Sequence, residues 1–106
     1  MASSKEYLDF VLDQLKPLQA INYRQMMGEY ILYYKEKIIG GIYDDRLLVK
    51  NIEVARNFCA SPRLELPYDG AKPMILVENV DDSDFLCRLF EEIFQNLPAP
   101  KAKKPR

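Results

Sequence analysis

Glu29-Tyr-Ile-Leu-Tyr-Tyr34 and Ile38-Ile-Gly-Gly-Ile-Tyr43 are two runs rich in Tyr and Ile, residue types that favour β-strands. Only the polar segment Lys35-Glu36-Lys37 separates them. Two strand-forming runs joined by so short a break predict a β-hairpin.

The β pattern extends from Ile21 to Lys50. Asp44-Asp45 predicts a second turn, because an Asp side chain can hydrogen-bond its own backbone. The residues from Arg46 to Lys50 then form a short strand with Leu47 and Val49 on one face. Strands that follow one another across short breaks predict a mainly antiparallel sheet.

Gly40-Gly41 lies inside the second strand-forming run. Glycines at such a position predict a β-bulge or a close approach of another backbone. A phosphate-binding loop would need spaced glycines followed by a helix, and the sequence meets neither condition.

Helices are predicted near both ends of the chain. Ser3 and Glu6 fit a capping box, and Pro17 ends the first helix. Asp81-Asp82-Ser83-Asp84 supplies candidate caps for the last helix, which Pro98 ends. Each helix has an apolar stripe at helical spacing: Leu8, Val11, Leu12 and Leu15 in the first, and Leu86, Leu89, Phe90, Ile93, Phe94 and Leu97 in the last.

Between these parts, residues 51–60 predict a short helix with Val54, Ala55 and Phe58 facing inward. Residues 61–73 contain three prolines and a glycine and are interpreted as a loop. The apolar run Met74 to Val77 is interpreted as a buried strand.

The expected fold class is therefore α+β, with a mainly antiparallel sheet and N- and C-terminal helices packed on it. The element order is α-β-β-β(-β)-α-β-α. A chain of 106 residues has room for one domain, which we assign to residues 1–98. Residues 99–106 form a basic tail of Pro, Lys, Ala and Arg that we expect to be disordered.

The formal net charge of -1 is an average over two unlike parts. Residues 1–100 carry 11 basic and 16 acidic residues, a net charge of -5, whereas the last six residues carry four basic residues and no acid. Lys101, Lys103, Lys104 and Arg106 could neutralise phosphates, so nucleic-acid binding is one hypothesis.

The absence of His argues against an enzyme. His is the only side chain that titrates near neutrality without being perturbed, and it is the commonest metal ligand. We therefore expect no catalytic residue, metal or cofactor. Cys59 and Cys87 have no metal-binding spacing and are interpreted as free thiols of a cytoplasmic protein. No apolar run is long enough to span a membrane.

Two groups of residues are candidates for binding. Tyr30 and Tyr34 share one sheet face opposite Tyr33, where they either pack across strands or line an interaction surface. Basic residues of the body that could form a local patch are Arg24, Arg46, Lys50 and Lys72. An exposed sheet edge could also pair with a second copy, and the sequence does not select which edge.

Four segments resemble the TfoX N-terminal domain family and together cover roughly residues 1–97. They are Ser3-Ser-Lys-Glu-Tyr7, Arg24-Gln-Met-Met-Gly-Glu-Tyr-Ile-Leu-Tyr-Tyr34, Asp44-Asp-Arg-Leu-Leu-Val-Lys50 and Tyr68-Asp-Gly-Ala-Lys-Pro-Met74. Gln25, Met27 and Ile31 depart from residues that are common in the family. The resemblance implies an α+β fold without catalytic residues, in a single-domain member that lacks the helical second domain of full-length regulators.

The resemblance also implies a role in transcription, as a co-regulator of natural competence. The leading hypothesis is a small non-enzymatic module that binds a protein partner, such as a transcription regulator. The alternatives are weak nucleic-acid binding through the tail and the basic residues of the body, and a small-ligand-binding domain lined by tyrosines.

Overall fold

The computed structural model describes residues 4–59 and 62–97, and the three helices and six strands in this part of the chain fix the architecture. The bounds in chain order are α1 (Lys5–Gln14), β1 (Ile21–Met26), β2 (Glu29–Tyr34), β3 (Lys37–Ile42), β4 (Leu47–Val49), α2 (Glu53–Phe58), β5 (Arg63–Glu65), β6 (Met74–Val77) and α3 (Ser83–Gln95).

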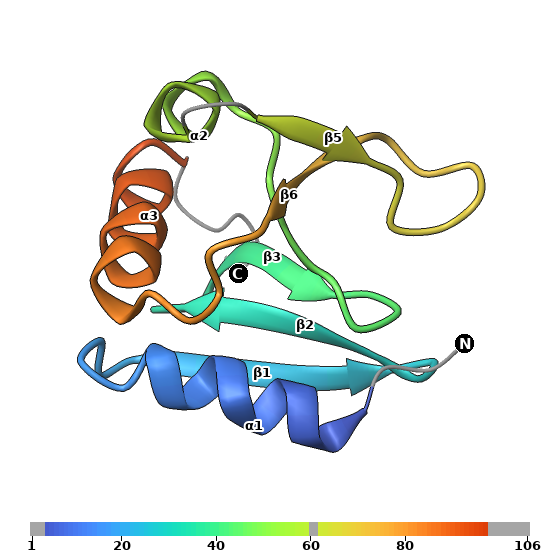
Figure 1. Cartoon of the computed structure of the whole chain (residues 1–106), viewed down its shortest axis with the longest axis horizontal. Helices are drawn as coiled ribbons and strands as arrows, with labels where there is room; N and C mark the ends of the chain where they lie inside the picture. Colours follow the sequence, from blue (N-terminus) through green and yellow to red (C-terminus); the bar gives the residue numbers. More distant parts are fainter. Residues whose placement is uncertain (1–3, 60–61, 98–106) are drawn as a thin grey trace, which may run out of the picture.

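The strands form one sheet in the order β1-β2-β3-β4-β6-β5, and every neighbouring pair is antiparallel (Figure 1). β1 and β5 are therefore the two edge strands. The register shifts once, between Leu32 and Tyr33 where β2 pairs with β3. This irregularity lies opposite Gly40, close to the position where the glycine pair predicted a bulge.

Three two-residue turns connect the first four strands, and both residues of each turn have positive φ. They are Met27-Gly28 (54° and 84°), Lys35-Glu36 (50° and 73°) and Asp44-Asp45 (55° and 56°). Such turns match the right-handed twist of the strands they join. At the third turn Tyr43 and Arg46 exchange backbone hydrogen bonds of 2.9 and 3.0 Å. The two turns predicted at Lys35–Lys37 and Asp44-Asp45 are confirmed.

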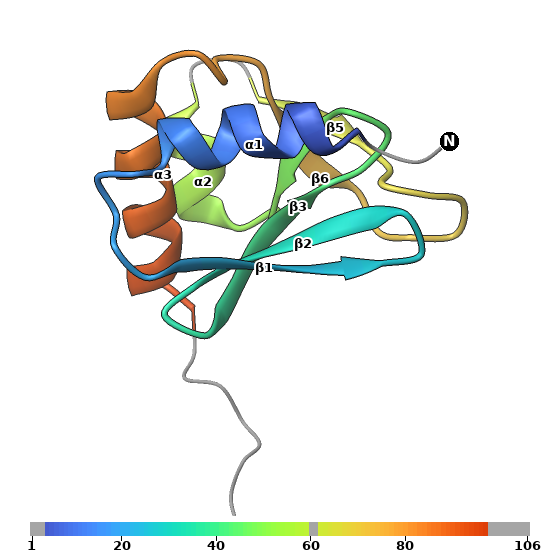
Figure 2. The same cartoon turned by 90° about the horizontal axis from the view of Figure 1, so that it is seen from below.

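All three helices pack on the same face of the sheet, which we call the covered face (Figure 2). The apolar stripe of α3 supplies Leu86, Leu89, Phe90 and Ile93 to the core. The strands supply Tyr30, Leu32, Tyr34, Ile39, Ile42, Leu47, Val49, Ile75 and Val77. By alternation, Ile31, Tyr33 and Leu48 point to the other face, which we call the open face.

Side-chain caps fix the N-termini of α1 and α3. Ser4 is the N-cap of α1 and its hydroxyl accepts a hydrogen bond from the Tyr7 amide at 3.1 Å. This corrects the prediction of Ser3, which lies outside the described residues. Asp82 caps α3 in the same way. Lys37 holds the C-terminal end of α3. Its Nζ donates to Phe94 O in the last turn at 3.2 Å and to Leu97 O, two residues beyond the helix, at 2.9 Å.

The expected fold class and element order are confirmed, with one correction. Residues 61–73 were interpreted as a loop, but Arg63–Glu65 forms β5, with Leu64 opposite Ile75 of β6. The error has a physical reason. Proline is tolerated just outside a short edge strand, so prolines at 62 and 67 do not exclude three paired residues between them.

Candidate functional site

Three connecting segments gather at one end of the sheet, which we call the turn end. They are the β1–β2 turn, the β3–β4 turn and the loop of residues 66–73, and both views place them on the same side of the molecule (Figures 1 and 2). A hydrogen bond of 3.1 Å from the Asp44 amide to Glu29 Oε1 ties the first two turns together. Segments that are far apart in the sequence therefore share one surface.

Two hollows at the turn end share Tyr43 and Tyr68 as a common wall. The first has a volume of about 550 Å³ and is otherwise lined by Met26, Met27, Glu29 and Ile31. The second has a volume of about 610 Å³ and is otherwise lined by Lys50, Asn51, Ile52, Pro67, Ala71, Lys72, Pro73 and Met74. We call the two together the turn-end groove. One half is apolar and the other carries two lysines.

Tyr43 is held firmly in this wall. A Cβ atom on Gly41 would come within 2.8 Å of Tyr43 Cε2, so the ring lies directly over the glycine. The ring centroids of Tyr43 and Tyr68 are 6.3 Å apart. Burial raises the pKa of the Tyr43 hydroxyl, and nearby Tyr68 and Glu29 raise it further. The hydroxyl therefore stays protonated at neutral pH.

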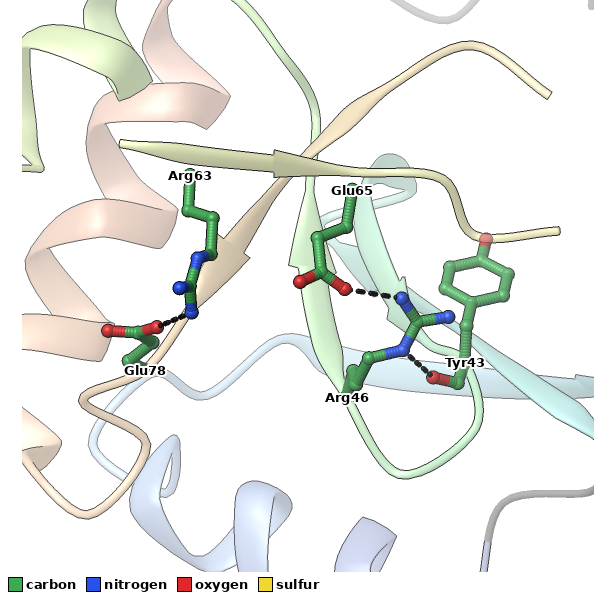
Figure 3. A network of polar contacts seen from close by, with 5 residues as sticks. All are labelled: Tyr43, Arg46, Arg63, Glu65 and Glu78. Atoms are coloured by element: carbon green, nitrogen blue, oxygen red, sulfur yellow. Dashed lines mark hydrogen bonds and ion pairs between the residues drawn. The ribbon is translucent and has the colours of Figure 1, made fainter. Parts of the chain in front are cut away.

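Arg46 holds the turn behind Tyr43 (Figure 3). Its Nε donates to the Tyr43 carbonyl oxygen at 3.1 Å, and its Nη1 lies 2.7 Å from Glu65 Oε1 of β5. A second pair, Arg63 Nη1 to Glu78 Oε2 at 2.9 Å, joins the start of β5 to the residue that follows β6. Arg46 was a candidate binding residue, and the structure places it in a partly buried ion pair that joins β5 to the β3–β4 turn.

The groove also contains residues that the sequence interpretation did not select. Met27 is 95% exposed although it is a large apolar residue, and its φ of 54° is unusual for anything but Gly, Asn or Asp. Tyr68 is 64% exposed. A methionine in a two-residue hairpin turn was the signal available for Met27, whereas only the folded chain brings Tyr68 beside it.

The predicted binding residues fall into different places. Lys50 and Lys72 line the same half of the groove. Arg24 lies instead on edge strand β1, beside a separate hollow. Tyr30 and Tyr34 are each only 5% exposed and belong to the core of the covered face, opposite Tyr33 as alternation predicted. Lys101, Lys103, Lys104 and Arg106 lie outside the described residues.

The part of the chain that the structure describes also bears on metal sites, membrane-spanning helices and thiols. Residues 4–59 and 62–97 contain no group of three or more His, Cys, Asp or Glu side chains arranged to hold a metal ion. None of their helices is long and apolar enough to span a membrane. Cys59 and Cys87 are free thiols, and burial raises the pKa of both.

Comparison with known proteins identifies a relative and a family for this chain. A search of the solved structures found no match. Over 107 aligned residues the chain is 35% identical to a protein of Spirochaeta aurantia named "uncharacterized 12.7 kDa protein in trpE 5′ region", covering 100% of this chain and 93% of that protein. Residues 13–92 match the model of the TfoX N-terminal domain. Since this match spans most of the chain, the protein belongs to the TfoX N-terminal domain family.

Proposed function

We propose that this chain is a non-enzymatic regulatory module that binds a protein partner through the turn-end groove. The supporting observation is the groove itself, with an aromatic wall between an apolar half and a half that carries two lysines. Membership of the TfoX N-terminal domain family supports a role in regulating transcription, in the setting of competence.

The composition of the groove suits a protein partner. Apolar residues that are exposed together on a small domain mark interaction sites, and aromatic and methionine side chains are enriched in them. Met27 and Tyr68 stand at the surface of the groove, while Tyr43 is anchored over Gly41. A fixed aromatic beside exposed apolar side chains offers a ready pocket for an apolar anchor of the partner.

Catalysis in this groove is disfavoured by its titratable groups. A general base must be deprotonated near the working pH, and the raised pKa of Tyr43 keeps that hydroxyl protonated. The remaining titratable groups of the lining are Glu29, Lys50, Tyr68 and Lys72. This set includes neither His nor Cys, the side chains that most often serve as base and nucleophile.

Affinity capture with matched variants tests the proposal. The bait is the full chain, and the groove variant combines Met27→Asp with Tyr68→Ala. The control is Leu64→Ser, because Leu64 is 48% exposed but belongs to edge strand β5 and faces away from the groove. We expect wild type and control to recover the same protein from an extract of the producing cells, and the groove variant to lose it.

Two outcomes would contradict the proposal. If the groove variant recovers as much partner as wild type, the groove is not the binding site. If wild type recovers nothing above background, the chain does not bind a protein partner. Identification of the captured protein by mass spectrometry tests the regulatory part separately. A captured protein with no connection to transcription would contradict the regulatory role, whereas the groove would remain the binding site.

Nucleic-acid binding is the second candidate, favoured by the convergence of Lys50 and Lys72 in one hollow. Its test compares duplex DNA binding by the full chain, by a chain ending at residue 97 and by the double variant Lys50→Glu, Lys72→Glu. Each lost phosphate contact should lower the salt dependence of log K by about 1. If binding disappears with residues 98–106 alone, the body does not bind DNA.

A further inference from the structure

The two edges of the sheet differ in how well they are protected against pairing with another strand. β5 has only three residues, two of them charged, and prolines stand just outside it at 62 and 67. β1 has six residues, no proline and a single charge at Arg24, and it pairs with β2 without a register shift. Proteins usually blunt free edges with short strands, charges, prolines or bulges. β5 is protected by its short length, its two charges and the prolines beside it, whereas β1 has only the charge of Arg24.

The backbone groups that β1 offers at its free edge follow from its register. The Ala20 carbonyl accepts a hydrogen bond from the Lys35 amide at 3.0 Å, so residues 20 and 35 form a hydrogen-bonded pair. Hydrogen-bonded and non-bonded pairs alternate along an antiparallel ladder. The N–H and C=O groups of Ile21, Tyr23 and Gln25 therefore point outward, away from β2. Figure 2 views the molecule from this side and shows no described element lying across β1.

We propose that β1 pairs antiparallel with β1 of a second copy, about a two-fold axis at Tyr23. Tyr23 then lies opposite Tyr23 of the second copy, and Ile21 lies opposite Gln25. All the outward-pointing groups are satisfied, because each of these pairs exchanges both of its hydrogen bonds. The two sheets become one continuous sheet with the helices of both copies on the same side.

Side-chain pairing selects this register over its neighbour. With the axis at Tyr23, the charged Arg24 lies opposite Asn22 of the second copy, which can accept a hydrogen bond from it. A shift of two residues in one direction would place Arg24 opposite Arg24, and like charges directly opposite are destabilising. Tyr23 is 40% exposed and already packs edge-on against Tyr30, with ring centroids 5.8 Å apart. This packing holds the Tyr23 ring in place for its contact with Tyr23 of the second copy.

The two ends of β1 also complement each other on the open face. A hollow of about 650 Å³ lies at the start of the strand, where its lining includes Ala20, Asn22 and Tyr33. Met26, at the end of the strand, is 46% exposed and shares that face. The proposed register sets Met26 opposite Ala20 of the second copy, over its hollow. The two-fold axis makes this contact twice, as expected of an interface that is the same patch on both copies.

The first test is the mass of the full chain in solution, measured by sedimentation equilibrium over a range of concentrations. We expect a monomer–dimer equilibrium that approaches twice 12.4 kDa. Gln25→Pro removes an outward N–H and leaves the β1–β2 ladder intact, so it should weaken dimerisation at least about tenfold. Gln25→Thr keeps the N–H and should dimerise like wild type. Circular dichroism verifies that both variants are folded.

The second test uses charge at the two-fold axis. Tyr23→Lys and Tyr23→Glu should each be monomeric, because each places like charges opposite one another. Mixed in equal amounts, they should form a heterodimer, because Lys then lies opposite Glu. A wild type that stays monomeric at every concentration would overturn the proposal. So would a dimer that persists in Gln25→Pro or in either Tyr23 variant alone, because its interface would lie elsewhere.

Discussion

On the covered face of the sheet, Leu32, Ile42 and Val49 are fully buried beneath helices. On the open face, Ile31 of the same strands lines a groove with Tyr43 and Tyr68, and Met27 at its rim is almost fully exposed. The covered face is built by regular elements with apolar periodicity. The groove on the open face is built by turns and a loop. The first arrangement serves stability, and the second leaves apolar side chains available to a partner.

The largest expected effect on stability comes from adding a side chain at Gly40, where β3 and β4 lie in close contact. A Cβ on Gly40 would meet the backbone of β4 at Leu48 O, and would come within 2.7 Å of Val49 Cα. Gly40→Ala should cost about 4 kcal/mol or more, because backbone atoms cannot move aside. Gly70→Ala is the control, since a Cβ there meets nothing within 4 Å and only the φ of 85° is unfavourable. It should cost about 1 kcal/mol. Urea unfolding measures both.

The second prediction separates the two faces directly. Phe90→Ala opens a cavity in the core of the covered face and should lower the free energy of unfolding by about 3–5 kcal/mol. Tyr68→Ala removes an aromatic that is 64% exposed and should change stability by less than about 0.5 kcal/mol. Only the Tyr68 variant should lose the captured partner while remaining folded. A large loss of stability in Tyr68→Ala would mean that the groove is part of the core.

The same contrast explains what the sequence could predict. The apolar stripe of α3 lies where periodicity placed it, because burial against a sheet requires that spacing. The continuous apolar run Met74–Val77 forms β6, the buried strand expected there. The turns at Lys35-Glu36 and Asp44-Asp45 were predicted from local chemistry. β5 was missed because prolines stand on both sides of it and its pairing with β6 is a backbone contact that the local sequence does not indicate.

The groove could be anticipated only in part. Lys50 and Lys72 were selected as basic residues, but their convergence depends on the path of residues 66–73 over the open face. Tyr30, Tyr34 and Tyr43 are all aromatic residues in or next to strands, but only Tyr30 and Tyr34 were named as candidates. Alternation placed the first two beneath the helices, whereas Tyr43 lies over Gly41 on the open face. Residue type could not distinguish these outcomes.

The third prediction concerns the end of the covered face farthest from the groove. Lys37 Nζ bonds two carbonyls at the C-terminus of α3 and lies 4.3 Å from the centre of the Phe94 ring. Lys37→Met removes the charged donor from both carbonyls and leaves Phe94 O only the Leu97 amide, 3.3 Å away, so it should cost about 1–2 kcal/mol in thermal or urea unfolding. Lys35→Met is the matched control, because Lys35 lies over the same ring at 5.4 Å and donates to neither carbonyl. Equal losses would refute the capping role.

The fourth prediction exposes a conflict between stability and binding at the open face. Met27 occupies the first position of a turn that favours Asn or Gly, so Met27→Asn should stabilise the protein by about 0.5–1 kcal/mol. The same change removes the most exposed apolar side chain of the groove and should weaken recovery of the partner. A variant that is both more stable and fully able to bind would show that Met27 is not part of the site.

The smallest expected effect compares one half-buried tyrosine from each face at high pH. Burial raises the pKa of Tyr43 in the groove wall and of Tyr7 on α1, from an ordinary value of 10.0. At a pH between this value and the raised pKa, the tyrosine hydroxyl has lost its proton in the unfolded chain but still holds it in the folded chain. Stability must therefore fall as pH rises above about 10. Urea unfolding from about pH 9 to pH 11 should show a shallower fall for Tyr43→Phe and for Tyr7→Phe than for wild type. An unchanged slope in Tyr43→Phe alone would mean that the groove wall is open to water, and the anchoring of Tyr43 over Gly41 would then have to be abandoned.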